Sequence, residues 1–300
     1  MVYDNFCENP ILMMEQISSC CESGEALSED VFNAISLNAS NIKYASKDAI
    51  RRELEKIIMS PNALPGLMTL YECGLLKFIL PQLDRCFYEP QRNKYHIYNV
   101  GEHIVHAVEA TPQILTVRWA ALFHDIGKPV CSSCDSSGII HFYGHHLESV
   151  KIANDICHRF AFDAELIKDI CTLVEYHDVH FEHSIKGVKR ALARLGESTF
   201  SMLMMLQEAD AKAKSPKYFE EKRAGIEALK RLYKRVVESG EPYRYSDLAI
   251  GKRDLIKMKY RAERQMRDVM RMLFEEVIDN PSLNNREYLL KRAQYYKNRC

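Results

Sequence analysis

The stretch WAALFHDIGKP, from Trp119 to Pro129, decides how the rest of the chain is interpreted. Its large apolar residues recur at the i, i+3, i+4 and i+7 spacing of one helix face: Trp119, Leu122, Phe123 and Ile126. This spacing predicts a buried helix, and the following Gly127 and Pro129 are expected to end it. The adjacent His124 and Asp125 therefore lie at its last turn.

A histidine beside an aspartate at a helix end is able to ligate a divalent cation. A lone pair of this kind is more often a capped core helix with a satisfied histidine. Here the metal interpretation is favoured, because further candidate ligands occur on both sides of the pair: His103, His145, His177 and Asp210.

The order His103, His124-Asp125, Asp210 resembles the HD superfamily of metal-dependent phosphohydrolases. Three runs narrow the resemblance: YHIYNVGEHIVHAVEATP (95–112), RWAALFHDIGKP (118–129) and HFYGHHLESV (141–150). Together they are similar to the HD-containing body of bacterial CCA-adding tRNA nucleotidyltransferases, because several motifs arrive in the same order and at matching separations.

An upstream region resembles the neck of the same enzymes, in the runs KDAIRRELEKIIM (47–59) and GLMTLYECGLLKFILPQL (66–83). The family's neck begins with an Arg-rich helix, whereas this chain has NPILMMEQISS (9–19), without arginine. No Gly-Gly or Gly-Ser loop followed by an Asp-x-Asp pair precedes it, and polymerisation needs such carboxylates to bind metal. We therefore expect that this chain alone does not add nucleotides.

The resemblance and the helical patterns together predict an all-α, elongated protein. Only residues 138–143 (GIIHFY) have the β-branched and aromatic character of a short extended hairpin. Three domains are expected: a helical neck-like domain (1–92), the HD domain (93–215) and a helical basic tail (216–300).

The resemblance also implies roles for individual residues. The implied metal ligands are His103, His124, Asp125, His145, His177 and Asp210, although in a single-metal version His145 and His177 serve as phosphate donors. Asp125 and Lys128 are the implied catalytic residues, and Lys128, Arg118 and His146 the implied substrate-binding residues; for Lys128 and Arg118, a solvated or structural role is equally open. Mixed nitrogen and oxygen ligands suit Mn, Ni, Co, Fe, Mg or Zn, and the sequence does not choose among them.

The segment 212–271 contains eighteen Lys and Arg against nine Asp and Glu, a net charge of +9 in a chain of zero formal charge. Such a run is usually a solvated face, and the alternative is a surface for a phosphate backbone such as tRNA. Where the family tail has a small Gly-containing turn after the sequence DLIKM, this chain has KYRAERQM (259–266). The candidate nucleic-acid ligands are Lys252, Arg253, Lys257 and Lys259.

The start of the chain and its apolar runs bear mainly on where in the cell the protein is expected. The start of the chain has neither a basic n-region nor an apolar h-region, and no apolar run approaches the length of a membrane span. We therefore expect a reduced, cytoplasmic protein. A zinc site formed by Cys131 and Cys134 with His141 and His145 is an alternative use of the only CxxC sequence.

The leading hypothesis is a metal-dependent phosphohydrolase acting on a nucleotide or RNA phosphoester, with 2′,3′-cyclic phosphates and phosphate monoesters favoured by family analogy. The first alternative is a headless relative of the CCA-adding enzyme that binds tRNA and performs no chemistry. The second is a body subunit that partners a separate nucleotidyltransferase head.

Overall fold

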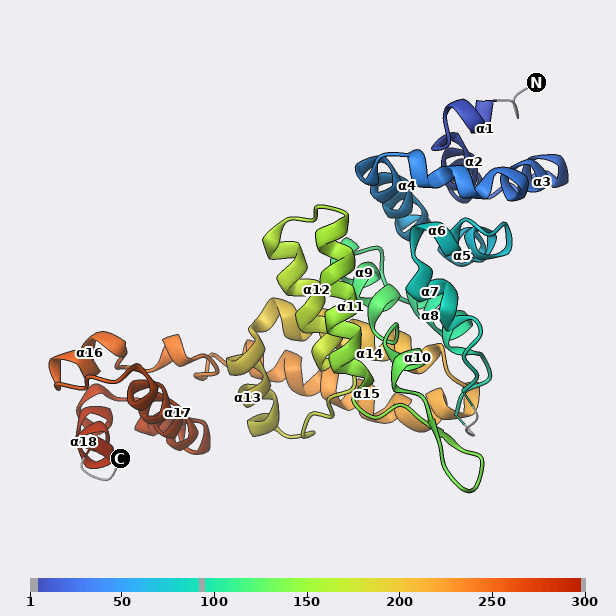
Figure 1. Ribbon diagram of the computed structural model, residues 1–300. Coiled ribbons are helices and arrows are strands. Elements are labelled where there is room, and N and C mark those ends of the chain that lie inside the picture. The colour runs from blue at the N-terminus through green and yellow to red at the C-terminus, as the bar shows by residue number, and fades with distance from the viewer. Residues whose placement is uncertain (1–4, 92–94, 298–300) are drawn as a thin grey trace. The chain divides into compact units, whose positions relative to one another are not determined.

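The computed structural model describes residues 5–91 and 95–297 (Figure 1). Within these ranges the regular secondary structure is helical apart from one two-stranded antiparallel hairpin, in which β1 (Ser133–Cys134) pairs with β2 (Ile140–His141). The predicted all-α class is confirmed. The extended segment was expected at 138–143, and its partner strand is contributed by the CxxC sequence.

The chain divides into two compact units. The first unit comprises Met1–Val179 and Ser201–Lys222, and the second comprises His180–Phe200 and Arg223–Cys300. The helices up to residue 179 are α1 (Asn5–Glu8), α2 (Leu12–Ser23), α3 (Glu29–Asn38), η2 (Ala39–Tyr44), α4 (Lys47–Met59), α5 (Ala63–Glu72), α6 (Leu76–Ile79), α7 (Pro81–Cys86), α8 (Val100–Ala110), α9 (Leu115–Phe123), α10 (Lys128–Cys131), α11 (His145–Arg159) and α12 (Ala164–Tyr176). The later helices are α13 (Ile185–Leu195), α14 (Glu197–Lys212), α15 (Pro216–Glu238), η3 (Tyr245–Asp247), α16 (Lys252–Lys257), α17 (Glu263–Asp279), η4 (Pro281–Leu283) and α18 (Arg286–Lys297).

These units do not coincide with the three segments expected from the sequence. The neck-like segment and most of the HD segment form one unit, while residues 180–200 join the tail. Their helix α13 packs on α17, where Arg190 donates to both carboxylate oxygens of Glu275 at 2.9 and 3.1 Å. Side-chain pairing across distant segments, which no local pattern reveals, draws α13 into the second unit.

Helix starts follow the capping signals in the sequence. The Ser28 hydroxyl accepts a hydrogen bond from the amide of Val31, and Ser46 accepts one from Ala49. Each bond satisfies a backbone donor that the first turn leaves free. Helices α3 and α4 therefore each start at the residue that follows a capping serine.

The core of the first unit surrounds α9. Trp119, Leu122 and Phe123 are fully buried, and α8, α4, α11 and α12 pack against this helix. Figure 1 shows α11 and α12 lying side by side next to α9. The helix ends at Phe123, slightly before the predicted breakers, so that His124 caps it and Asp125 lies in the following turn.

The second unit has its own apolar core, built mainly from α16, α17 and α18. A break separates α16 from α17, and there Lys259 adopts a φ of +63°. The Lys259 amide donates to the carbonyl oxygen of Ile256, and the Tyr260 amide donates to the carbonyl oxygen of Leu255. This is the bonding pattern of a left-handed helix C-cap. The position after DLIKM thus keeps the turn that a small residue would favour, although a lysine occupies it.

Among the described residues, no helix combines the length and the apolarity that crossing a bilayer requires.

Two left-handed positions in the first unit give a matched stability test. Ala161 (φ +53°) ends α11 and Gly74 (φ +78°) follows α5, and a Cβ at Gly74 would meet no atom within 4 Å. Because left-handed backbone is costly for every residue with a Cβ, Ala161→Gly should raise the free energy of unfolding by about 0.5–1 kcal/mol. Gly74→Ala should lower it by a similar amount. Chemical denaturation of the two variants measures both, and shifts of the same sign would contradict this assignment.

Candidate metal centre

Four histidines and two aspartates from five separate places in the chain meet inside the first unit. His103 comes from α8, His124 and Asp125 follow α9, His145 begins α11, His177 caps α12 and Asp210 lies on α14. They form two groups that share Asp125: His103, His124, Asp125 and Asp210, and Asp125, His145 and His177. These are the six side chains that the resemblance implied as metal ligands.

In the first group, the imidazoles of His103 and His124 approach each other through their Nε2 atoms at 3.2 Å. Each Nε2 lies 3.2 Å from Oδ2 of Asp125. Oδ1 of Asp210 completes the group at 3.0 Å from His103 Nε2 and 3.6 Å from His124 Nε2. Both histidines are fully buried, so this is an interior cluster.

The second group uses the other oxygen of the same carboxylate. Oδ1 of Asp125 lies 3.2 Å from His145 Nε2 and 3.6 Å from His177 Nε2. These two Nε2 atoms are 3.3 Å apart. Asp125 therefore bridges the two groups, one oxygen to each.

The outer nitrogen of all four rings is engaged in the same way. Nδ1 lies within hydrogen-bond distance of a backbone carbonyl oxygen in His103 (Ala213, 3.2 Å), His124 (Ala121, 2.7 Å), His145 (Phe142, 2.9 Å) and His177 (Val174, 2.7 Å). A carbonyl only accepts, so each Nδ1 carries a hydrogen and each Nε2 faces the cluster, where a ring that is unprotonated at Nε2 offers its lone pair to a cation. A ligating histidine held by a carbonyl at its other nitrogen is the usual arrangement around protein-bound metals.

The charges of the cluster favour a cation. Burial by itself lowers the pKa of His124, but the Asp125 and Asp210 carboxylates raise that pKa to about 9. Burial would raise the pKa of Asp125, yet His124 and Lys128 hold it well below its usual range. Burial likewise opposes the ionisation of Asp210, whose pKa is held low chiefly by Lys214. The environment that keeps a proton on His124 also suits a divalent ion coordinated by nitrogen and oxygen.

Two lysines accompany the carboxylates. Nζ of Lys128 lies 2.6 Å from Oδ2 of Asp125 and donates to Oε1 of Gln91 at 2.7 Å. Nζ of Lys214 lies 2.6 Å from Oδ2 of Asp210. Gln91 and Lys214 were not anticipated, although the i, i+4 spacing of Lys214 after Asp210 was a usable signal.

Local backbone features bring the ligands together. Gly144 is left-handed (φ +75°) and starts α11 with His145 as its first residue. Gly127 approaches the first turn of α11 so closely that a Cβ there would lie 2.5 Å from the amide nitrogen of Ser149 and 2.7 Å from the carbonyl oxygen of His145. The Gly127 amide also donates to the Ser149 hydroxyl at 2.9 Å. Glycine at position 127 thus lets Asp125 and His145 approach each other.

The other predicted site residues lie elsewhere. The buried Arg118 guanidinium donates to the carbonyl oxygens of Ile58, Ser60, Thr111 and Pro112, which ties the end of α4 to the end of α8. His146 lies beside His145 with ring centroids 6.0 Å apart and belongs to neither group. Arg118 therefore has a structural role here, and we do not assign it to substrate.

The four candidate nucleic-acid ligands of the tail lie in the second unit. Lys252, Arg253, Lys257 and Lys259 are exposed, and Lys252 pairs with Glu263 at 2.6 Å. The CxxC cysteines belong to neither cluster in the described part of the chain, and His145, the proposed fourth zinc ligand, lies in the Asp125 group. The zinc alternative thereby loses one of its ligands.

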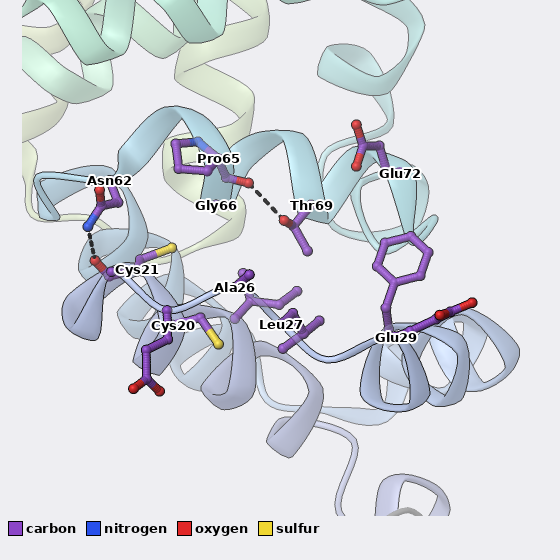
Figure 2. Close-up of a pocket in the computed structure, with 14 residues that line it drawn as sticks. Cys20, Cys21, Ala26, Leu27, Glu29, Asn62, Pro65, Gly66, Thr69 and Glu72 are labelled. Carbon is purple, nitrogen blue, oxygen red and sulfur yellow. Dashed lines mark hydrogen bonds between the residues drawn. The ribbon is translucent and has the colours of Figure 1, made fainter.

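A cavity of about 490 Å³ in the neck is separate from this cluster (Figure 2). It lies between α2, α3 and α5, with an apolar wall that includes Ile17 and Phe32 and with Glu25, Glu29 and Glu72 around it. Residues 1–42 contain seven Asp and Glu and no Lys or Arg. Like charges repel, so this surface is unsuited to a phosphate-bearing ligand.

Comparisons with known families agree with this arrangement. Residues 94–232 match the family described as "HD domain", and residues 26–87 match the one described as "Probable RNA and SrmB- binding site of polymerase A". In the crystal structure of the Bacillus stearothermophilus CCA-adding enzyme in complex with CTP, a similar fold covers 99% of this chain and 65% of that chain. The TM-score is 0.60 and the sequence identity 18%, so this likeness concerns the fold alone.

Curated relatives cover shorter parts. The A-adding tRNA nucleotidyltransferase of Deinococcus radiodurans is 30% identical over 59% of this chain and 42% of its own length. The Multifunctional CCA protein of an Azoarcus species is 29% identical over 57% of this chain and 39% of its own. The bifunctional uridylyltransferase/uridylyl-removing enzyme of Streptomyces coelicolor is 27% identical over 78% of this chain and 29% of its own. The chain thus spans less than half the length of these relatives.

The close approach at Gly127 can be tested directly. In Gly127→Ala the new methyl group meets backbone atoms of α11 that have no room to move, and overpacking of this kind costs about 1–3 kcal/mol. We expect a loss of that size in the free energy of unfolding, measured by denaturant titration. Val130→Ala, an exposed change on the next turn, is the control and should be nearly neutral. Equal stability of both variants would refute the close packing.

Proposed function

Because this chain contains an HD domain and is similar to CCA-adding tRNA nucleotidyltransferases, we propose that it is a divalent-metal-dependent phosphohydrolase that cleaves a phosphoester of a nucleotide or of RNA. The observation that carries the proposal is the double cluster around Asp125, in which four Nε2 atoms and two carboxylates converge. Carboxylates removed from water need cationic partners: Lys128 and Lys214 each contact one of them, and divalent ions among the histidine nitrogens would complete the pairing.

The residues divide the work as follows. His103, His124, Asp125 and Asp210 would hold one divalent ion, and Asp125, His145 and His177 would hold a second. A divalent ion in such a site makes a water nucleophile available near neutral pH and neutralises charge on the phosphoryl group. The carbonyl-anchored rings keep their lone pairs aimed inward, which maintains the geometry without reorganisation.

Lys128 has the position expected of a phosphate-binding residue. Its ammonium is almost fully buried and is fixed between Asp125 and Gln91. Burial strengthens its attraction for an incoming phosphate, because the local dielectric is lower than that of water. We assign Lys128 to the substrate phosphate and Asp125 to the metal.

A relative supports hydrolysis as well as transfer. The Streptomyces coelicolor protein is named for a uridylyl-removing activity in addition to a uridylyltransferase one, and removal of a uridylyl group breaks a phosphoester bond. The similarity covers 78% of this chain. By analogy with HD-family phosphohydrolases, 2′,3′-cyclic nucleotides and nucleoside monophosphates are the first substrates to assay.

The decisive variant is the double change His124→Ala and Asp125→Ala. It removes ligands from both groups, so bound metal and hydrolysis of 2′,3′-cyclic AMP should fall together by at least about 100-fold. Elemental analysis and phosphodiesterase assays with added Mn²⁺, Ni²⁺ or Co²⁺ measure the two quantities. His158→Ala, an exposed histidine on α11, is the matched control and should behave as the unaltered protein. Turnover that survives in the folded double variant would exclude this site as its source.

A second function, RNA binding, is favoured by the distribution of charge. The segment 212–271 carries a net +9, while residues 1–42 carry seven acidic residues and no basic ones. Within the segment 212–271, four basic side chains lie exposed on or next to α16 in the second unit: Lys252, Arg253, Lys257 and Lys259. We propose that RNA contacts are made chiefly through this basic segment, since its net charge of +9 attracts a phosphate backbone whereas residues 1–42 repel one.

The salt dependence of tRNA affinity tests this second proposal. Each phosphate contact contributes about 0.7–0.9 to the slope of log affinity against log salt. Replacing Lys252, Arg253, Lys257 and Lys259 by alanine should therefore reduce the slope by up to about 3–4. A control variant with alanine at four exposed basic positions of the neck region, Lys43, Lys47, Arg52 and Lys56, should keep the slope. Equal losses in the two variants would argue for non-specific attraction.

A further inference from the structure

A pair of tyrosines adjoins the Asp210 side of the cluster. Tyr95 precedes α8 and Tyr218 lies in the first turn of α15, and their rings meet edge to face with centroids 5.1 Å apart at 62°. Tyr95 is 38% exposed, so its ring is not simply part of the core. An aromatic ring held at a surface beside a phosphate-cleaving cluster is a feature that the metal chemistry does not require.

The backbone around Tyr95 is fixed to the cluster from two directions. The next residue, His96, packs its ring against that of His103 with centroids 5.1 Å apart. The amide of Ser215 donates to the Tyr95 carbonyl at 2.8 Å, and the nearby Ala213 carbonyl accepts from His103 Nδ1. Tyr95 is therefore held in place relative to His103 by residues from both α8 and the end of α14.

Lys214 links the aromatic pair to the carboxylate. Its Nζ lies 2.6 Å from Asp210 Oδ2 and 5.2 Å from the centre of the Tyr218 ring. The ammonium orients Tyr218 through a cation–π contact, and Tyr218 in turn supports the edge of the Tyr95 ring. The sequence of contacts from Asp210 through Lys214 and Tyr218 to Tyr95 places an aromatic face and a positive charge together.

We propose that Tyr95 is the base-stacking residue of the substrate site, with Tyr218 as its positioning residue. The substrate is then a nucleotide, or a nucleotide unit of RNA, whose base lies on Tyr95 while its phosphate lies at the cluster. Every nucleobase offers a π-face, and stacking on an aromatic side chain contributes about 1–3 kcal/mol per base. This inference rests on the proposed hydrolase function. It adds a binding site for the nucleobase, the part of the substrate that the metal cluster does not contact.

Two ligands that differ only in the base separate this idea from general phosphate binding. They are the non-hydrolysable phosphonate analogues of AMP and of ribose 5-phosphate, in which carbon replaces the ester oxygen. Calorimetric titration of the Mn²⁺-loaded full chain measures both affinities without turnover. We expect the adenosine analogue to bind more tightly, and Tyr95→Leu to weaken it about 5- to 150-fold while leaving the ribose analogue unchanged. Tyr95→Phe, which keeps the ring, should retain the affinity.

A second exposed tyrosine, Tyr44, provides the control. Tyr44 is 74% exposed in the neck and also has a lysine over its ring, Lys43 at 4.9 Å, so Tyr44→Leu is the matched variant and should change neither affinity. Equal binding of the two ligands to the unaltered protein, absence of binding, or an equal loss for both ligands in Tyr95→Leu overturns the proposal. Hydrolysis of 2′,3′-cyclic AMP is measured separately. If the protein hydrolyses 2′,3′-cyclic AMP but binds both analogues equally, the stacking role of Tyr95 is wrong and the hydrolase proposal stands. If the adenosine analogue binds more tightly but no hydrolysis is seen, the stacking role stands and the hydrolase proposal is wrong.

Discussion

The buried carboxylate of Asp125 is the interaction on which the first unit depends. One oxygen faces His103, His124 and Lys128, and the other faces His145 and His177. Asp125 is only 2% exposed, and it thereby brings together five side chains, which come from four helical segments and from the turn after α9. An ionised carboxylate in the interior is tolerated only when it is well paired, so the positions of these segments and the charge of Asp125 depend on each other.

A second constraint is the separation of charge along a chain that is neutral overall. The acidic neck surrounds a cavity lined by three glutamates, and the basic segment extends through α15 to α17. Residues 26–87 match a family whose description names a probable binding site for RNA and SrmB. Residues 26–87 of this chain contain seven acidic and seven basic side chains, so the matched region has no net charge, and the surplus of positive charge that suits a phosphate backbone lies in residues 212–271.

Local signals in the sequence were sufficient to predict the helices and the order of the candidate metal ligands along the chain. The apolar spacing of α9 and the serine caps of α3 and α4 act within one turn, so they could be recognised without the fold. Gln91 and Tyr95 could not be recognised in this way, because their importance arises from contacts with Lys128 and Tyr218, which are distant in sequence. Lys214 had a local signal in its i, i+4 spacing from Asp210, but that spacing alone does not show that Asp210 lies at a buried cluster. The ion pair of Arg190 with Glu275, which draws α13 into the second unit, is invisible to local patterns for the same reason.

The cluster also bears on whether the chain is only a binding module. A protein that merely holds RNA needs exposed cations, and the exposed lysines and arginines of the second unit already provide them. It has no need for four imidazole nitrogens facing the carboxylates of Asp125 and Asp210, and replacing such a set with apolar side chains would usually not weaken the fold. The two features therefore suit different ligands: the basic surface suits a polyanion, and the interior cluster suits a divalent cation.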